Sequence, residues 1–466
     1  MSEKDKKHLP DVDIGTPADM SEVMRKYDRE SATRIWEGKP KVVVSVVMAL
    51  FSLYCIWSTL RCTWDMPIRL SSFLGLIIVM GYLTYPARKD HVKPNAMPWY
   101  DVVLMLLGAG SFFYYCVNYK SLVMVITSAG KINPASETAI PNAWFYLVIG
   151  IVAILCLAEL CRRCVGLPIL GVVGVLLVYT FASGQNLARV IYTLFYGTSG
   201  VMATPIQVCA KFIAVFIIFG AFLERTGISS FFIDLANSLA GSTSGGPAKV
   251  AVISSALCGM VSGSSVGNTV TTGSVTIPMM KRTGYQGEFA AAVEAAASTG
   301  GQIMPPIMGA AAFLMAEYMD TTYANVALKA ILPALLYFTG IFMAVHLEAR
   351  RLNLKGVPRD QLPKLRLLVR SIYLLLPLVV LVWMVSTGTR TLQFSASVAI
   401  LLAILVSLPH MFTDSRNQHD EGFAAHFVKD TASMTVSALE SGGRSCITVA
   451  VACSMAGMVA GCITVT

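Results

Sequence analysis

The feature that most constrains this chain is a long apolar stretch that helix-breaking residues interrupt twice. Residues 251–280 contain no charged side chain, yet Ser, Gly and Asn residues cluster in their middle, at 262–268. A second interruption follows at 298–306 and ends in Pro305 and Pro306. In hydrocarbon, non-helical backbone persists only where protein, water or a ligand satisfies its N–H and C=O groups. Paired interruptions of this kind indicate a transport site near the membrane midplane.

The composition places the chain among α-helical, polytopic membrane proteins. Of its 466 residues, 55% are apolar and 14% are charged, whereas ordinary soluble domains have about 25% charged residues. The six histidines are scattered, and the one close cysteine pair, Cys161 and Cys164, is interpreted as two small apolar residues at a helix end. No Ser/His/Asp, His-pair or acidic cluster indicates a membrane enzyme. We therefore predict an all-α membrane protein that is not an enzyme.

Apolar runs of the length that a membrane-spanning helix needs define the expected organisation. A polar tail at 1–41 is followed by a four-helix module at 42–161, a second module at 166–347 and a further group at 368–466. A polar segment at 411–444 is expected before the last run. The candidate spans are 42–60, 69–85, 100–118, 143–161, 166–183, 203–224, 324–347, 368–386, 391–410 and 445–466.

Positive charge determines the expected orientation of the central stretch. The basic segments 281–282 and 348–370 belong in the cytoplasm, together with the N-terminus. Residues 247–281 must then enter and leave on one side, and each arm, about 20–24 Å long, is too short to cross. The sequence predicts a re-entrant helical hairpin at 247–281. Residues 285–319 then cross once, unwound at 300–306, because an unbroken helix would reach about 52 Å.

Three segments resemble the TRAP transporters (tripartite ATP-independent periplasmic transporters). They are FGAFLERTG at 219–227, GMVSGSSVGNTV at 259–270 and GGQIMPPIMG at 300–309. The match is nearest to the fused permease, in which small and large membrane subunits share one chain and the partner is a TAXI-type periplasmic binding protein. The resemblance implies sodium-coupled import of small organic acids across a bacterial inner membrane by an elevator mechanism, with sodium as the coupling ion and no other cofactor.

The resemblance also implies roles for the modules. The resemblance assigns residues 42–161 to a small-subunit-like scaffold and residues 166–347 to the first repeat of the transport module. It assigns residues 368–466 to the start of an inverted second repeat. We expect the chain to be a C-terminally truncated form of such a permease. The second hairpin, the second broken helix and a second sodium site would lie beyond it, and the chain alone would not complete a transport cycle.

Both interruptions offer the oxygen ligands that a hard cation prefers. Without carboxylates, a sodium site must use hydroxyls and backbone carbonyls, and the carbonyls of Gly301 and Met304 are expected to lack donors because Pro305 and Pro306 have no N–H. The structural alternative is that small residues allow close helix packing and that proline only kinks the helix. By resemblance, the sodium ligands are Ser262, Ser265, Asn268, Gly301, Met304 and Pro305.

The substrate is expected to be anionic, because helices that restart after each interruption point their N-termini at the midplane. Lys211, in the middle of the 203–224 span, either faces the substrate, pairs with Glu294 or is a structural, snorkelling side chain. Glu294 alternatively lies on a water-filled face. The candidate substrate ligands are Ser264, Thr269, Thr271, Thr272, Gln302 and Lys211.

Other functions compete with this interpretation. A divalent-anion sodium symporter also uses hairpins, and would not depend on a binding protein. A passive channel would show neither counterflow nor substrate saturation. A non-transporting membrane fragment is the third alternative.

Overall fold

A computed structural model of the chain describes residues 33–87, 94–388, 390–418 and 423–466. Within these residues every regular element is a helix, and nine helices are long and apolar enough to cross a membrane. The prediction of an all-α, polytopic membrane protein is confirmed. The nine helices are Lys39–Leu60, Met66–Thr84, Trp99–Val125, Ala143–Cys164, Thr204–Arg225, Tyr323–Arg351, Val369–Thr387, Leu392–Pro409 and Phe427–Val465.

The described residues form two compact units. One unit contains Phe219–Ala438, and the other contains residues 33–218 together with Leu439–Thr466. These are spatial groupings, so the repeat boundaries expected at 166–347 and 368–466 stay predictions.

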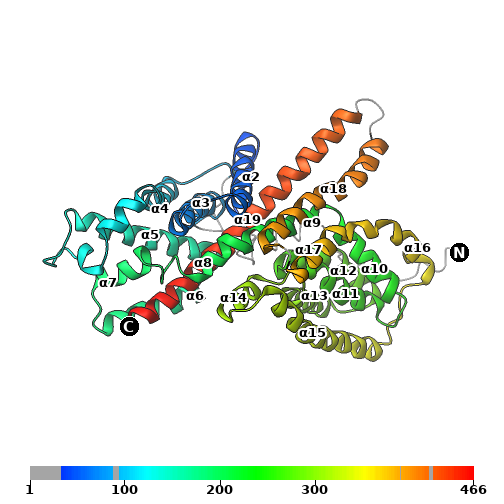
Figure 1. The fold of residues 1–466 in the computed structure, drawn as a ribbon. Coiled ribbons are helices and arrows are strands. Elements are labelled where there is room, and N and C mark those ends of the chain that lie inside the picture. The colour runs from blue at the N-terminus through cyan, green and yellow to red at the C-terminus, as the bar shows by residue number, and fades with distance from the viewer. Residues whose placement is uncertain (1–32, 88–93, 389, 419–422) are drawn as a thin grey trace. The chain divides into compact units, whose positions relative to one another are not determined.

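The N-terminal bundle is the group of four helices that opens the second of these units, coloured blue to cyan in Figure 1. Within it α3 packs along α4, and α4 packs against α5. The shared interior is apolar, and Phe73 of α3 and Phe112 of α4 are fully buried there. The four helices are α2 (Lys39–Leu60), α3 (Met66–Thr84), α4 (Trp99–Val125) and α5 (Ala143–Cys164).

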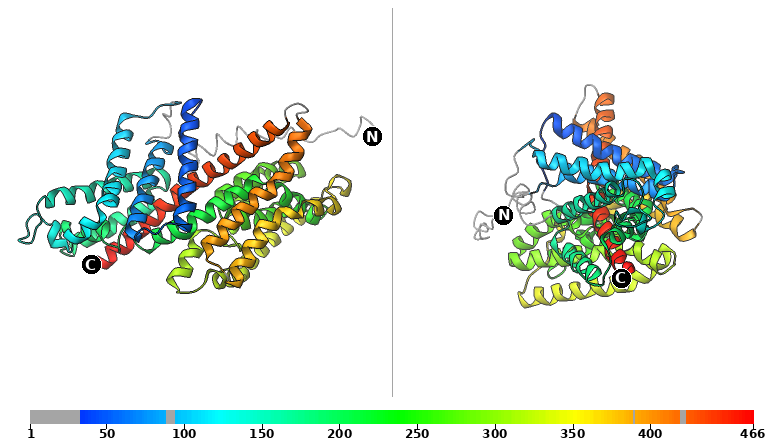
Figure 2. Two further views of the ribbon diagram at one scale, coloured as in Figure 1. Left: turned by 45° about the horizontal axis from the view of Figure 1, so that its top comes forward. Right: turned by 90° about the vertical axis from the view of Figure 1, so that its left-hand side faces the viewer.

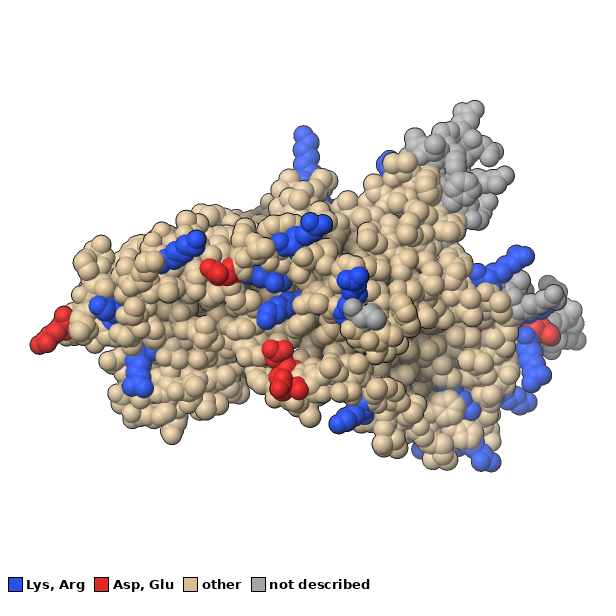
Figure 3. Space-filling view, in the orientation of Figure 1, with Lys and Arg blue, Asp and Glu red and all other residues tan. Residues whose placement is uncertain are grey.

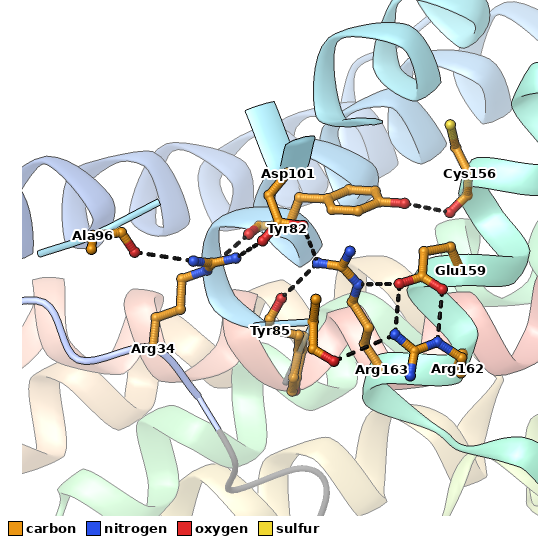
Figure 4. A network of polar contacts seen from close by, with 10 residues as sticks. Arg34, Tyr82, Tyr85, Ala96, Asp101, Cys156, Glu159, Arg162 and Arg163 are labelled. Carbon is orange, nitrogen blue, oxygen red and sulfur yellow. Dashed lines mark hydrogen bonds and ion pairs between the residues drawn. The ribbon is translucent and has the colours of Figure 1, made fainter. Parts of the chain in front are cut away.

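A buried polar network joins the segment before α2 to α4 and α5 (Figure 4). Asp101, in the first turn of α4, contacts Arg34 through one carboxylate oxygen, and its other oxygen lies 2.7 Å from Nη1 of Arg163. Glu159, one turn before Arg163 on α5, accepts hydrogen bonds from both Arg162 and Arg163. The bundle therefore has an interior ion-pair network in addition to its apolar core.

The other unit is built around an antiparallel series of helices, green to yellow in Figure 2. Each helix from α10 to α13 packs against the next, and α15 packs against α11 and α13. Alanines dominate the core between α11, α13 and α15, which allows the backbones to approach closely. The helices are α10 (Ile228–Ala240), α11 (Gly246–Ser262), α12 (Ser265–Thr283), α13 (Gly287–Gly300), α14 (Ala310–Tyr318) and α15 (Tyr323–Arg351).

The helices of the C-terminal part are longer than the apolar runs expected there. α18 (Leu392–Gln418) extends into the polar segment at 411–444, and α19 (Phe423–Val465) occupies most of the rest of it. No proline interrupts α19, so its backbone hydrogen bonds can continue through the polar part. Ser52 of α2 also holds this part, donating a hydrogen bond to the carbonyl of Leu439 at 2.6 Å.

The remaining helices are shorter. A π-helical segment, Tyr192–Tyr196, continues α7, and another, Cys209–Ile213, joins α8 to α9. The helices are α6 (Leu167–Ala182), α7 (Leu187–Ile191), α8 (Thr204–Val208), α9 (Ala214–Arg225), α16 (Leu365–Leu368) and α17 (Leu376–Thr387).

The surface has the character expected of a protein in lipid. On the face shown in Figure 3, Lys, Arg, Asp and Glu side chains are sparse. Exposed leucines recur every fourth residue along α15, at Leu328, Leu332 and Leu336. This spacing places them on one face of the helix. An exposed apolar stripe of this kind is stable where hydrocarbon, not water, surrounds the helix.

Candidate functional site

The helical hairpin expected at 247–281 is formed by α11 and α12. α11 ends at Ser262, and the chain reverses through Gly263 and Ser264 before α12 begins. Gly263 has a φ of +60°, a left-handed conformation that favours glycine. Ser264 caps α12, because its Oγ accepts a hydrogen bond from the N–H of Gly267 at 3.2 Å. The segment is therefore two antiparallel arms and not one straight helix.

The second interruption separates α13 from α14. α13 ends at Gly300, a 3-10 turn covers Gly301–Ile303, and α14 starts at Ala310. Between them Met304 is extended, and the Pro305–Pro306 peptide bond is cis. The prolines supply no N–H to a helix, which explains why helical structure stops here.

Neighbouring elements bond the backbone groups that this interruption frees. The N–H of Ile307 donates to the carbonyl of Met260, close to the hairpin tip, at 3.3 Å. The hydroxyl of Tyr323, at the start of α15, donates to the carbonyl of Pro306 at 2.7 Å. Protein groups thus satisfy non-helical backbone that hydrocarbon could not.

The two interruptions lie against each other. A Cβ atom built on Gly259 would lie 2.3 Å from the Cα of Gly301, so the two backbones meet where neither residue has a side chain. The side-chain amide of Gln302 donates to Oγ of Ser265 at 3.1 Å. The hairpin tip and the unwound segment therefore form one site, as the paired pattern in the sequence indicates.

Asn268 has the clearest geometry among the candidate cation ligands. The residue is 1% exposed, and its Nδ2 donates to the carbonyl of Ser255 at 2.8 Å. Its Oδ1 is buried and has no hydrogen-bond partner. Gly301 lies beside it, since a Cβ built there would be 3.3 Å from Asn268 Nδ2. A buried oxygen without a donor is a group that a bound cation would satisfy.

The carbonyl of Gly301 is less free than the sequence indicates. It accepts a hydrogen bond from the N–H of Met304 at 3.3 Å, so the expectation that it lacks a donor is wrong. The 3-10 turn supplies the N–H that Pro305 cannot, and one lone pair of the carbonyl oxygen remains. The other candidates at these two interruptions are Ser262, Ser265 and Pro305.

The candidate substrate ligands fall into an accessible group and a buried one. Thr272 is fully buried, and its hydroxyl lies 2.8 Å from the carbonyl of Asn268. It faces the helix packing and not the hairpin tip, although its role as a substrate ligand stays a prediction. The partly or fully exposed candidates at the two interruptions are Ser264, Thr269, Thr271 and Gln302.

Lys211 lies in a different unit from the two interruptions. It occupies the π-helical segment Cys209–Ile213, so its pairing with Glu294 and its contact with substrate both stay predictions. Glu294 itself is fully buried. The alternative that its carboxylate lies on a water-filled face is therefore wrong.

A cluster of hydroxyl groups surrounds Glu294, and the sequence analysis did not identify it. Oε1 of Glu294 accepts from Ser255 at 2.7 Å, from Ser298 at 3.1 Å and from Thr272. Oε2 accepts from Thr276 at 2.5 Å. Thr272 and Thr276 are four residues apart on α12, and Glu294 and Ser298 are four residues apart on α13. That spacing puts each pair on a single face and is the signal that could have revealed the cluster.

A second acidic residue, Glu224 near the end of α9, lies beside the hairpin tip. Its Oε1 would be 3.8 Å from a Cβ atom built on Gly267, in the first turn of α12. A carboxyl group from α9 therefore lies beside the first turn of α12.

Comparison with known proteins identifies what the chain is similar to. The family model of the tripartite ATP-independent periplasmic transporter DctM component matches residues 152–466. The C4-dicarboxylate TRAP transporter large permease protein DctM of Pseudomonas aeruginosa is 29% identical over 197 residues, 42% of this chain and 46% of that protein. Its namesake in Vibrio cholerae is 29% identical over 215 residues, 44% of each chain.

A further relative is the isethionate TRAP transporter permease protein DctMQ of Oleidesulfovibrio alaskensis. It is 26% identical over 197 residues, which are 42% of this chain and 30% of that protein. The chain thus matches less than half the length of these relatives. The family match includes the hairpin and the broken helix, whose interruptions meet in the structure. This polytopic membrane chain belongs to the family of DctM components of tripartite ATP-independent periplasmic transporters.

Proposed function

We propose that the protein is the membrane permease of a sodium-coupled importer of small organic acids. The observation that carries the proposal is the junction of the two interruptions, where the buried Oδ1 of Asn268 has no hydrogen-bond partner. Family membership and the paired interruptions both support transport at this junction.

The proposed coupling ion is a sodium ion held by oxygen atoms at the junction. Asn268 would contribute Oδ1, and Gly301 the remaining lone pair of its carbonyl. Ser265 would contribute its hydroxyl. The carboxylate of Glu224, beside the tip, would favour a cation there electrostatically. Ser262, Met304 and Pro305 complete the proposed ligand set.

The proposed substrate is a small carboxylate bound next to the cation. The N-terminus of α12 places the positive end of the helix dipole at the junction. Thr269 and Thr271 stand on the first turns of the same helix. Relatives of the chain are named for C4-dicarboxylates and isethionate, all of them small anions.

Family membership supports a periplasmic binding protein as the partner and the bacterial inner membrane as the location. A periplasmic binding protein of the TAXI type would deliver the acid to a permease in the bacterial inner membrane, with its N-terminus in the cytoplasm. We assign the unit that contains both interruptions, Phe219–Ala438, to the moving domain of an elevator. The N-terminal bundle would be the fused small-subunit-like part of the scaffold.

Reconstituted uptake tests the proposal. The natural full-length permease, placed in liposomes with its binding protein, should accumulate a radiolabelled organic acid only under an inward sodium gradient. Uptake that is indifferent to sodium contradicts the coupling. Uptake without the binding protein would favour a divalent-anion symporter, and the absence of counterflow would favour a channel.

A pair of asparagine variants tests the assigned site. Asn268→Ala should raise the sodium concentration for half-maximal uptake by about 10- to 100-fold, because a direct ligand is lost. Asn325→Ala is the matched control, since Asn325 is exposed at the start of α15 and contacts only that region. Equal sodium dependence in the two variants would remove Asn268 from the site.

A further inference from the structure

Glu294 is a buried carboxyl group that no part of the proposed transport site uses directly. It is fully buried, and its partners come from three helices: Ser255 on α11, Thr272 and Thr276 on α12, and Ser298 on its own α13. All four partners are hydroxyl groups, and no salt bridge to Glu294 is present among the described residues. A polar group so deeply buried is retained only when hydrogen bonds satisfy it.

The contacts in this cluster have the geometry of direct hydrogen bonds. Oε1 of Glu294 lies 2.7 Å from Ser255 Oγ, and Oε2 lies 2.5 Å from Thr276 Oγ1. These are the distances of O–H···O hydrogen bonds to a carboxylate. The cluster is therefore a hydrogen-bond hub that joins three helices.

Two of the residues that contact Glu294 also hold Asn268. The carbonyl of Ser255 accepts from Nδ2 of Asn268 at 2.8 Å, and the hydroxyl of Thr272 lies 2.8 Å from the carbonyl of Asn268. Because a carbonyl can only accept, the contact with Ser255 determines which end of the amide is the nitrogen. Oδ1 must then point the other way, where it has no partner.

We propose that Glu294 is a positioning residue, which orients the side-chain amide of Asn268 through Ser255 and thereby sets the affinity for the coupling cation. The inference rests on the proposed sodium site. In metal sites, the groups that hold the ligands in place affect affinity almost as much as the ligands themselves. Glu294 is such a group, because Ser255 alone lies between it and the side chain of the proposed ligand.

The test compares two substitutions of Glu294 in the permease reconstituted with its binding protein. Glu294→Ala should raise the sodium concentration for half-maximal uptake by about 10- to 100-fold, with the maximal rate at saturating sodium within about 3-fold of wild type. Glu294→Gln should remain near wild type. Its Oε1 can still accept from Ser255, and its Nε2 can donate to Thr276, whose hydroxyl lies 3.0 Å from the carbonyl of Thr272.

Controls separate positioning from a general loss of structure. Glu288→Ala changes an exposed glutamate on the same helix and should leave sodium dependence unchanged. In an Asn268→Ala background, Glu294→Ala should have no further effect on sodium affinity, because the group that it orients is gone. Additive effects of the two substitutions would overturn the proposal.

Two outcomes distinguish failure of the inference from failure of the proposed function. If wild-type uptake and wild-type thermal stability both ignore sodium, the proposed coupling fails and the inference with it. If wild type responds to sodium and Glu294→Ala responds equally, only the inference fails. Should Glu294→Ala not fold, Ser255→Ala replaces it, since it removes one contact with Glu294. A wild-type sodium affinity in that variant would overturn the proposal.

Discussion

Asp101 and Glu294 are both fully buried acidic residues, but the two units of the molecule satisfy them in opposite ways. Asp101 lies between two guanidinium groups, those of Arg34 and Arg163 (Figure 4). Glu294 is surrounded by hydroxyl groups from three helices. One acid is paired with opposite charge, and the other is held only by neutral donors.

The difference teaches what each cluster can do. Each arginine that holds Asp101 has further partners: Arg34 donates to the carbonyls of Tyr82 and Ala96, and Arg163 donates to Glu159. Removing one member of such a buried ion pair leaves another charge without compensation, which costs about 3–5 kcal/mol. A hydrogen bond from a hydroxyl group to a carboxylate contributes about 1.5–3 kcal/mol, and losing one such donor leaves no second charge unpaired. The first cluster is therefore suited to stabilising the bundle, and the second to orienting a site.

The largest expected effect comes from breaking the ion-pair cluster. Asp101→Ala should lower the free energy of unfolding by about 3–5 kcal/mol, because two buried guanidinium groups lose their shared counter-charge. The measurement is thermal or denaturant unfolding of the purified permease in detergent. Sodium affinity should not change, since Arg34 and Arg163, the partners of Asp101, lie in the same unit as Asp101, whereas the junction of the interruptions belongs to the other unit. A loss of stability below about 1 kcal/mol would contradict the assigned role.

Replacing each buried acid by its amide should give losses of stability of intermediate size, and these losses compare the two clusters directly. Asp101→Asn should cost about 2–3 kcal/mol, because its new NH₂ group must face an arginine N–H. Glu294→Gln should cost less than about 1 kcal/mol, because hydroxyl groups can either donate or accept. The same unfolding measurement on both variants checks the difference. Equal losses would show that charge matters equally in the two clusters.

The smallest expected effect is at the edge of the ion-pair network. The Arg162 side chain is 43% exposed and pairs with Glu159 three residues earlier on α5. Arg162→Ala should therefore change the free energy of unfolding by no more than about 1 kcal/mol. A loss as large as that of Asp101→Ala would mean that the network acts as one unit, and that exposure does not predict the contribution of its members.

Local features of the sequence predicted most of the fold. Hydropathy and length located the apolar helices, because a spanning helix must be apolar along its own sequence. Charge at 281–282, together with the length of the arms, predicted the hairpin that α11 and α12 form. The helices α18 and α19 extend beyond the apolar runs at 391–410 and 445–466 into the polar segment 411–444, because hydropathy marks only the apolar part of a helix, whereas contacts with α2 also support the polar part of α19.

The candidate site was predictable only in part. Gly, Ser, Asn and Pro residues marked both interruptions. Because these residue types disfavour a helix at the position where they stand, the sequence alone located the interruptions. The partners of the polar groups could not, as the Gly301 carbonyl shows: it bonds to Met304 through a turn that sequence periodicity does not reveal. Thr272 was similarly grouped with accessible threonines, although its hydroxyl faces Glu294.

The sequence by itself determined that this is a polytopic helical membrane protein with two interrupted segments, because apolar length and the missing N–H of proline are properties of local chain. Only the tertiary structure decided that the interruptions touch at Gly259 and Gly301, and that Glu294 bonds Ser255, a residue 39 positions away. The physical reason is that a buried polar group must find a partner wherever packing places one, and packing depends on helices far apart in the sequence.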